Sequence, residues 1–378
     1  MLTIKDGLIF ADPAMTTLIG IMPGLAQSQV TIPSSVKAIT GYQAVVAYNT
    51  QTGEIVNPTF DKTNGFKLPE GSQLKDLGSV GAFQQVGKIT PGTPASQGPA
   101  GPAGRAGATQ PQFTNPVDGL KTLTSINFAN GSQLQTIGPK AFLGCSNLTA
   151  VSLPDSCNTI GTQAFQNCTS LQSINLKGVQ YIGDGAFNNA FIAPNNAIAM
   201  ANPVTLNLSS AQFIGTGAFD SSYWTATSGG QVIAGTTEGS GATEDPHLSK
   251  ISTVTFGNKL NTLNQYAFNG ANYLTSVDLS SCTSLAKVSD NAFSRTDNLT
   301  SVKFSNTIET IGQSAFSGAK ALKSANFPSG LKTIDQNAFS NCPLTGSFNP
   351  ESTTLNIGQM LLMAANLTQS TLVKSQVI

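Results

Sequence analysis

The sequence predicts a strand-dominated repeat solenoid of the α/β type: a right-handed coil with a parallel sheet along one side and loop insertions on one edge. Three observations lead to this fold. The dipeptide Ala-Phe recurs at a nearly constant spacing, a short segment of alternating apolar and polar residues precedes the copies, and only 10% of the 378 residues are charged, against roughly 25% in a typical globular protein. The phenylalanines of the repeated dipeptide are Phe142, Phe165, Phe187, Phe219, Phe268, Phe293, Phe316 and Phe339.

Each repeat unit has three parts, which residues 299–316 illustrate. The segment "LTSVKF" has apolar residues at its first, fourth and sixth positions, which fits a short strand whose last two apolar side chains point inward. A second apolar pair, "IETI", follows, and then comes Gly312. Equivalent residues elsewhere are Gly, Asn, Ser or Asp, which tolerate left-handed backbone angles, so a tight corner is expected there. The third part ends in Ala-Phe and predicts a ladder of buried phenylalanines.

One such unit cannot bury its apolar face alone, so neighbouring units must stack. Its signature is L-x-x-I-x-[LF], followed by x-x-x-I-G-x-x-A-F-x-x-C. In this signature the chain resembles the BspA-like, or treponemal-type, leucine-rich repeat family over residues 120–345. The resemblance implies a leucine-rich-repeat coil. For function it implies secretion or display on a cell surface, with adhesion to host or microbial partners.

Weaker copies of the pattern extend upstream, in "VTIPSSVKAITGYQAV" (30–45) and "FKLPEGSQLKDLGSVGAF" (66–83). We therefore interpret residues 30–90 as two degenerate units. The expected organisation is an N-terminal cap (1–29), degenerate leucine-rich repeats with a collagen-like insertion at 88–119 (30–119), the leucine-rich repeat solenoid (120–345) and a C-terminal cap (346–378).

The charge balance excludes some classes of partner. The 19 basic and 19 acidic residues cancel, so no basic face is available for nucleic acid or an anionic membrane. No run of 18 apolar residues occurs, so no membrane span is expected. The start of the chain lacks the basic and apolar regions of a secretory signal.

The cysteines and the histidine give little support for catalysis. Cys145, Cys168 and Cys342 each lie three residues after a repeat phenylalanine, where other units have Ala, Ser or Thr. This pattern favours a slot for a small side chain, with a zinc or disulfide framework as the alternative. The single histidine, His247, has no recognisable triad partners. We expect no enzymatic activity, no cofactor and no metal.

Insertions are the places where a localised function is expected, since they all follow the Ala-Phe dipeptide and should emerge along one edge. They comprise residues 88–119, 188–202 and 220–250. Tyr223, Trp224 and His247 form a candidate interaction loop; alternatively, Trp224 packs over neighbouring repeats. In residues 98–109 glycine recurs at every third position, as in collagen, which suggests either an extended linker or a short trimeric collar.

The outward positions of the repeat strands predict a small, polar and nearly uncharged concave face. This face suits repeated hydrogen bonding to glycans or to another subunit. Its candidate residues are Asn127, Asn175, Asp278 and Lys303.

Two functions are consistent with these patterns. The first is a non-enzymatic, surface-exposed adhesion or protein-interaction scaffold, extracellular or on a cell surface, with a protein or glycan partner on a host or microbial surface. The second is a structural subunit of an assembled particle, such as a virus or phage fibre or a capsid decoration protein, located in the virion and bound to like subunits. The missing leader and the collagen-like tract favour the second.

Overall fold

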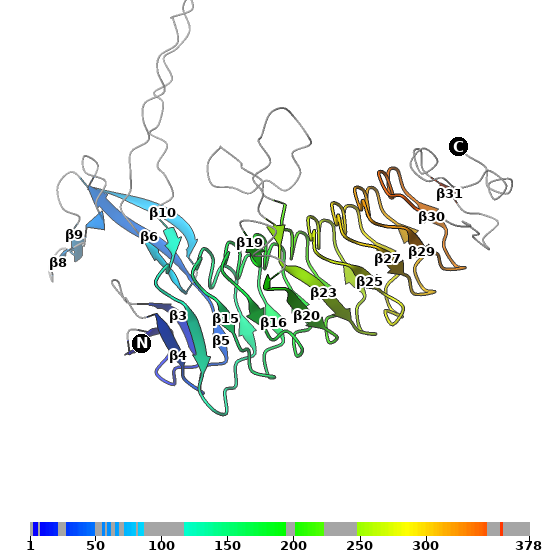
Figure 1. Ribbon diagram of the computed structural model, residues 1–378. Helices are drawn as coiled ribbons and strands as arrows, with labels where there is room; N and C mark the ends of the chain where they lie inside the picture. Colours follow the sequence, from blue (N-terminus) through cyan, green and yellow to red (C-terminus); the bar gives the residue numbers. More distant parts are fainter. Residues whose placement is uncertain are drawn as a thin grey trace, which may run out of the picture.

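The chain forms an elongated solenoid of stacked coils (Figure 1). A computed structural model describes residues 3–6, 8–21, 28–49, 55–56, 59–61, 65–67, 72–80, 82–86, 117–193, 201–222, 248–345 and 356–357. Every element whose bounds are described is a β-strand, and most strands of the coils pair in parallel. The prediction of a strand-dominated repeat solenoid is therefore confirmed.

The first ladder of parallel strands is built from the alternating segments that open each repeat. It is divided into sheets of four, two and three strands. Its strands are β4 (Gln29–Ile32), β13 (Ser125–Phe128), β15 (Ala150–Val151), β17 (Ser173–Ile174), β20 (Val204–Leu208), β23 (Ile251–Phe256), β25 (Ser276–Asp278), β27 (Ser301–Lys303) and β29 (Ser324–Asn326).

A second ladder, which the sequence did not predict, is formed largely by two-residue strands of the Thr-Ile type. Most of its strands pair in parallel, and β1 to β3 add an antiparallel meander at its N-terminal end. Its strands are β1 (Thr3–Lys5), β2 (Leu8–Phe10), β3 (Thr17–Ile21), β5 (Ala38–Ile39), β14 (Thr136–Ile137), β16 (Thr159–Ile160), β18 (Tyr181–Ile182), β21 (Phe213–Ile214), β24 (Thr262–Leu263), β26 (Lys287–Val288), β28 (Thr310–Ile311), β30 (Thr333–Ile334) and β31 (Asn356–Ile357).

The core contains a continuous stack of phenylalanine rings. From Phe142 to Phe339, successive ring centroids lie 5.0–5.5 Å apart in nearly parallel planes. Every one of these side chains is at most 1% exposed. The stack continues across both insertions, because Phe187, Phe219 and Phe268 are consecutive rings although 32 and 49 residues separate them. The ring stack therefore continues through the coils on either side of each insertion, although the pairing of β20 with β23 has a register shift at Val204–Thr205.

The corner glycines serve a different purpose from the one expected. Gly161 and Gly183 do not have left-handed φ angles; the left-handed residues lie two positions later, at Gln163 (φ 58°) and Gly185 (φ 59°). A Cβ on Gly161 would instead lie 2.6 Å from the backbone nitrogen of Pro139 in the preceding coil. The expectation of a left-handed corner at this position was wrong, because the glycine is required by close stacking of the coils.

The N-terminal region differs from the interpretation of residues 30–90 as two units. Only β4 and β5 join the parallel ladders there, and β6 pairs antiparallel with β10. Phe83 stacks on Phe142 at 4.6 Å, so Ala82-Phe83 completes the coil that β4 and β5 begin. Residues 30–90 thus supply one coil with antiparallel strands inserted into it, and the domain boundaries themselves stay a prediction.

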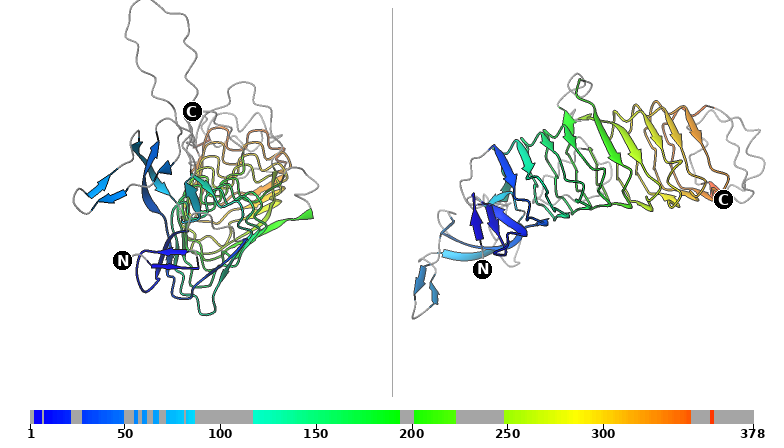
Figure 2. Two further views of the ribbon diagram at one scale, coloured as in Figure 1. Left: turned by 90° about the vertical axis from the view of Figure 1, so that its left-hand side faces the viewer. Right: turned by 90° about the horizontal axis from the view of Figure 1, so that it is seen from below.

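The remaining strands are all antiparallel. In Figures 1 and 2, β8 and β9 lie away from the stacked coils at the N-terminal end. These strands are β6 (Tyr42–Asn49), β7 (Ile55–Val56), β8 (Thr59–Asp61), β9 (Gly65–Lys67), β10 (Ser72–Val80), β11 (Gln84–Val86), β12 (Val117–Gly119), β19 (Ile192–Ala193) and β22 (Leu248–Ser249).

Candidate interaction faces

The outward side chains of the first ladder form a polar face, which we call the Ser/Asn face. Side chains alternate across the strands, so one set is buried and the other faces solvent. The polar members of this face are Gln29, Thr31, Ser125, Asn127, Ser173, Asn175, Thr205, Asn207, Thr253, Thr255, Ser276, Asp278, Ser301, Lys303, Ser324 and Asn326, all exposed or half-exposed. Ala150 of β15 is the apolar residue in register with Ser125 and Ser173. All four candidate residues of the predicted concave face belong to the Ser/Asn face.

Strand pairing aligns these side chains in two rows along the solenoid. In the C-terminal sheet, Ser276, Ser301 and Ser324 are in register, as are Asp278, Lys303 and Asn326. Neighbouring strands lie about 4.8 Å apart, so each row presents a hydroxyl, an amide or a charged group at that interval. The face can therefore offer the same hydrogen-bonding groups repeatedly to one elongated partner.

Several Asn and Asp side chains of this face also end their strands. The Oδ1 atoms of Asn175, Asn207 and Asp278 accept hydrogen bonds from backbone N–H groups two residues later, at 3.2, 3.1 and 3.0 Å. This is the turn that Asx residues commonly form. Asn175 and Asp278 thus have a structural role that sequence reasoning missed.

One ion pair crosses the Ser/Asn face. Lys303 Nζ lies 3.6 Å from Asp278 Oδ2, with the side chains 66% and 54% exposed. Hydrogen bonds from the hydroxyl and N–H groups of Ser280, followed by the Lys303 charge, hold the pKa of Asp278 below its ordinary value, although partial burial opposes the shift. Because both charges are well hydrated, the pair contributes little to stability, and both groups remain accessible to a partner.

The candidate interaction loop cannot be placed in the same way. Tyr223, Trp224 and His247 lie outside the described residues, as does the collagen-like tract 98–109. The structure does describe where two insertions join the solenoid. There β19 pairs antiparallel with β22, which brings the chain at 192–193 beside the chain at 248–249. The 188–202 insertion and the C-terminal end of the 220–250 insertion therefore lie side by side at this strand pair.

A buried carboxyl group lies where the third insertion leaves the coil. Asp220 is 6% exposed, and its Oδ1 accepts hydrogen bonds from the N–H and hydroxyl groups of Ser222 and from the Asn269 amide, at 2.9, 2.6 and 3.3 Å. Burial raises the pKa of Asp220 to about 7, although these hydrogen bonds and the Arg295 charge oppose the shift. Sequence reasoning missed this group, because the residue after Ala-Phe carries no repeated signal.

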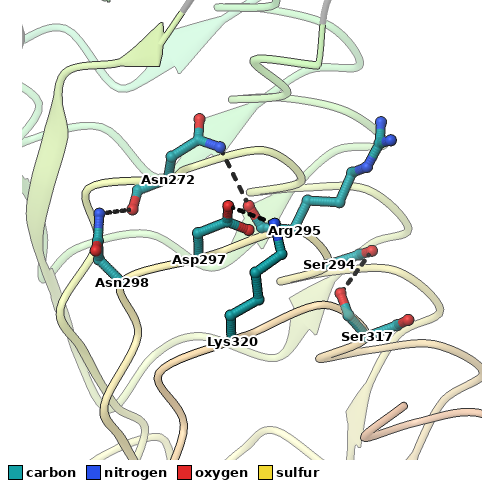
Figure 3. Close-up of polar contacts among 7 residues, drawn as sticks. All are labelled: Asn272, Ser294, Arg295, Asp297, Asn298, Ser317 and Lys320. Carbon is teal, nitrogen blue, oxygen red and sulfur yellow. Dashed lines mark hydrogen bonds and ion pairs between the residues drawn. The ribbon is translucent and has the colours of Figure 1, made fainter. Parts of the chain in front are cut away.

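The turns that follow Ala-Phe in neighbouring coils are joined by polar contacts (Figure 3). The Asn298 amide donates to the Asn272 carbonyl at 2.8 Å, and Lys320 Nζ lies 3.0 Å from Asp297 Oδ2. Arg295 is the one charged residue with a left-handed φ angle (58°) in this row of turns, where Gly and Asn are the other left-handed residues. Its guanidinium group points away from these contacts.

The second ladder carries an exposed aromatic pair that sequence reasoning also missed. The rings of Tyr181 and Phe213 stack with centroids 4.7 Å apart and planes 7° apart. Tyr181 is 43% exposed. The signal was present in the sequence, since these two residues occupy the position that is Thr in most repeats.

All five cysteines are buried. Among the described residues, no group of three or more His, Cys, Asp or Glu side chains could hold a metal ion. The thiols of Cys168 and Cys342 donate to carbonyl oxygens of the preceding coil at 3.2 and 3.0 Å, as Thr296 does within its own coil at 2.8 Å. Burial raises the pKa of Cys342 to about 12. These cysteines act as small buried side chains.

Two ladders of short parallel strands around a stacked phenylalanine core define a leucine-rich-repeat solenoid. The chain matches the family model described as BspA type leucine rich repeat region, present in six copies, over residues 118–223 and 247–368. These ranges make up more than half of the chain. It therefore belongs to the BspA-type leucine-rich repeat family.

Solved structures of bacterial leucine-rich repeat proteins match this chain at low sequence identity. A leucine-rich repeat protein from Bacteroides ovatus is 19% identical, with a TM-score of 0.38; the match covers 74% of this chain, which spans only 56% of that one. The pneumococcal vaccine antigen PcpA is 16% identical, with a TM-score of 0.41, over 95% of this chain and 78% of that one. A leucine-rich cell surface protein from Faecalibacterium prausnitzii is also 16% identical, with a TM-score of 0.38, over 99% and 97%.

No curated protein matches the sequence. Within the described part of the chain, no helix has the length and apolar character needed to cross a membrane.

Proposed function

We propose that this protein is a non-enzymatic, surface-exposed interaction scaffold that binds a protein partner along the Ser/Asn face, outside the cell or on its surface. The observation that supports the proposal is the regular alternation of the first ladder. Buried residues such as Val277 and Val302 hold the strands, while the residues that face solvent along the ladder are mostly Ser, Thr and Asn. Membership of a leucine-rich repeat family also supports binding along the Ser/Asn face, because such solenoids present extended binding surfaces.

The residue composition of the Ser/Asn face indicates which kind of partner it could bind. It contains no large apolar side chain and only one ion pair, so a single buried hot spot is not expected to dominate binding. Many weak hydrogen bonds along an elongated partner fit the two rows better. This arrangement supports the proposal of adhesion to proteins on a host or microbial surface.

Binding to immobilised fibronectin, laminin and mucin by surface plasmon resonance tests the proposal. Asn127→Lys combined with Thr253→Lys places long charged side chains on the Ser/Asn face, and Asn306→Lys is the matched control at an exposed turn position. We expect binding to at least one probe that the double variant weakens by about tenfold, or roughly 1.4 kcal/mol, while the control leaves it unchanged. Binding to none of the probes, or equal binding by both variants, would contradict the proposal.

A structural subunit of an assembled particle is the second candidate. It is favoured by the pairing of β19 with β22, which gathers two insertions at one place on the solenoid and would suit contacts between like subunits. Sedimentation velocity over a range of concentrations distinguishes the two functions. Concentration-dependent assembly supports the particle, and a strict monomer that binds a probe protein supports the scaffold.

A further inference from the structure

The outward position of the second ladder changes character in the middle of the solenoid. Strand pairing places one residue of each coil in this column. Its members from β14 to β30 are Thr136, Thr159, Tyr181, Phe213, Thr262, Lys287, Thr310 and Thr333. Five threonines show that a coil closes without an aromatic ring at this point. The two rings are therefore not needed to fill the core.

Each ring of the pair has one face that the other ring does not cover. The centroid separation of 4.7 Å is close to the spacing of neighbouring strands, about 4.8 Å, so the two rings stack in the direction in which the coils stack. Each ring covers one face of the other. The second face of Tyr181 looks toward Thr159, and that of Phe213 toward Thr262. Because a threonine is shorter than either ring, part of each outer face extends beyond its neighbour, which agrees with the 43% exposure of Tyr181 and the half-exposure of Phe213. We call these two places the notches.

Amide side chains line both notches in the adjacent column. Gln212 Nε2 donates to Gln180 Oε1 at 3.1 Å beside the rings. In the flanking coils, the hydroxyl groups of Thr159 and Thr262 each donate to the Asn residue before them at 2.8 Å. Each hydroxyl oxygen keeps lone pairs that can accept, and each Asn amide keeps N–H groups that can donate. The two central coils thus each pair a ring with a Gln side chain, and the coil on either side of them pairs a Thr with an Asn side chain.

We propose that Tyr181 and Phe213, with the amide and hydroxyl groups beside them, form a binding site for a neutral oligosaccharide. The apolar C–H face of a pyranose packs against an open ring face, and its hydroxyl groups exchange hydrogen bonds with the amides. A chain of several sugars running along the axis reaches both notches. The site lies on the second ladder, so it does not depend on the function proposed for the Ser/Asn face.

Charge complementarity favours this class of ligand. The residues of the two columns across these four coils, from 158–159 to 261–262, include no Asp, Glu, Lys or Arg. An acidic sugar or a phosphate group would therefore find no cation there. A protein partner usually requires an apolar centre within a larger interface, whereas here two rings lie among polar side chains.

Isothermal titration with cellohexaose, maltoheptaose and chitohexaose tests the site, with sialyllactose as an acidic comparison. Concentrations up to about 10 mM detect dissociation constants near 1 mM. We expect at least one neutral probe to bind, and sialyllactose to bind more weakly. Tyr181→Thr combined with Phe213→Thr restores the residue found in other coils and should weaken binding by about tenfold or more. Thr310→Ala, in the same column but away from the rings, is the control and should bind normally.

A second double variant is needed because the first could lose binding by misfolding. Gln180→Ala combined with Gln212→Ala keeps both rings and removes the amides between them, so binding should weaken while the thermal transition stays unchanged. The proposal is overturned if no neutral probe binds, if both double variants bind as the unchanged protein does, or if sialyllactose binds more tightly than every neutral probe.

Discussion

Removing one ring from the phenylalanine stack should destabilise the solenoid strongly. Phe316 is fully buried. Its ring stacks on Phe293 at 5.4 Å and on Phe339 at 5.2 Å, and it meets Phe304 edge-on at 5.8 Å. Replacing a buried phenylalanine with alanine typically costs 3–5 kcal/mol, and each aromatic pair adds about 0.5–1.5 kcal/mol beyond area burial. With three partners lost, we expect Phe316→Ala to cost about 5 kcal/mol.

Urea unfolding followed by far-UV circular dichroism measures this cost, and Phe316→Leu is the matched control. Leucine keeps most of the apolar volume but loses the aromatic contacts, so about 1–3 kcal/mol is expected. Because repeat proteins can lose cooperativity, hydrogen exchange should show whether the coils after Phe316 open separately. A loss below about 1 kcal/mol for Phe316→Ala would refute the role assigned to the ring stack.

Three further predictions concern the spacing of the coils, a buried acid and a surface ion pair. A Cβ on Gly183 would lie 2.6 Å from the Thr162 nitrogen, so thermal unfolding of Gly183→Ala should show a loss of about 1–3 kcal/mol, whereas Ser289→Ala, at the equivalent corner, should change stability by under about 0.5 kcal/mol. The pKa of Asp220 is raised from 3.8 to about 7, so the folded state binds a proton that the unfolded state has released between these values. Stability should therefore fall by roughly 3 kcal/mol as pH rises from about 4 to about 7. Asp220→Asn should remove that dependence in denaturant titrations at several pH values, and an unchanged pH profile would show that Asp220 does not titrate in this range. Lys303→Ala should cost less than about 1 kcal/mol in the same assay, and a larger loss would mean that the exposed pair is stronger than its hydration allows.

The sequence predicted the parts of the fold that depend on repeated burial. The Ala-Phe spacing predicted the ring stack, because a large apolar side chain repeated at a fixed interval has to be buried in every coil. The second ladder was missed because strands of two residues, such as Thr310–Ile311, are too short to show a period of two. The corner glycines were misread because glycine permits both positive φ angles and close backbone approach, and sequence does not separate the two.

The candidate sites were less predictable. Outward Asn and Asp residues were found by alternation, but their strand-ending hydrogen bonds depend on the turn that follows each strand. Tyr181 and Phe213 are 32 residues apart in the chain and become neighbours only because the insertion between them leaves the coil. The interpretation of residues 30–45 as a full unit failed because Val45 lies in β6, which pairs with β10. Such antiparallel pairing has no signature in the repeat itself.

The pairing of β19 with β22 also has a mechanical consequence. A force applied to the two ends of the solenoid would act on this antiparallel pair and on the coil that it encloses, since β20 and β21 pair with strands of the neighbouring coils. Once the pair opens and the enclosed coil detaches, about 54 residues become extensible, and at roughly 3.4 Å per residue they add about 180 Å of chain. The middle of the molecule is thus built to lengthen in one large step, whereas uninterrupted coils would release their length in shorter, regular ones.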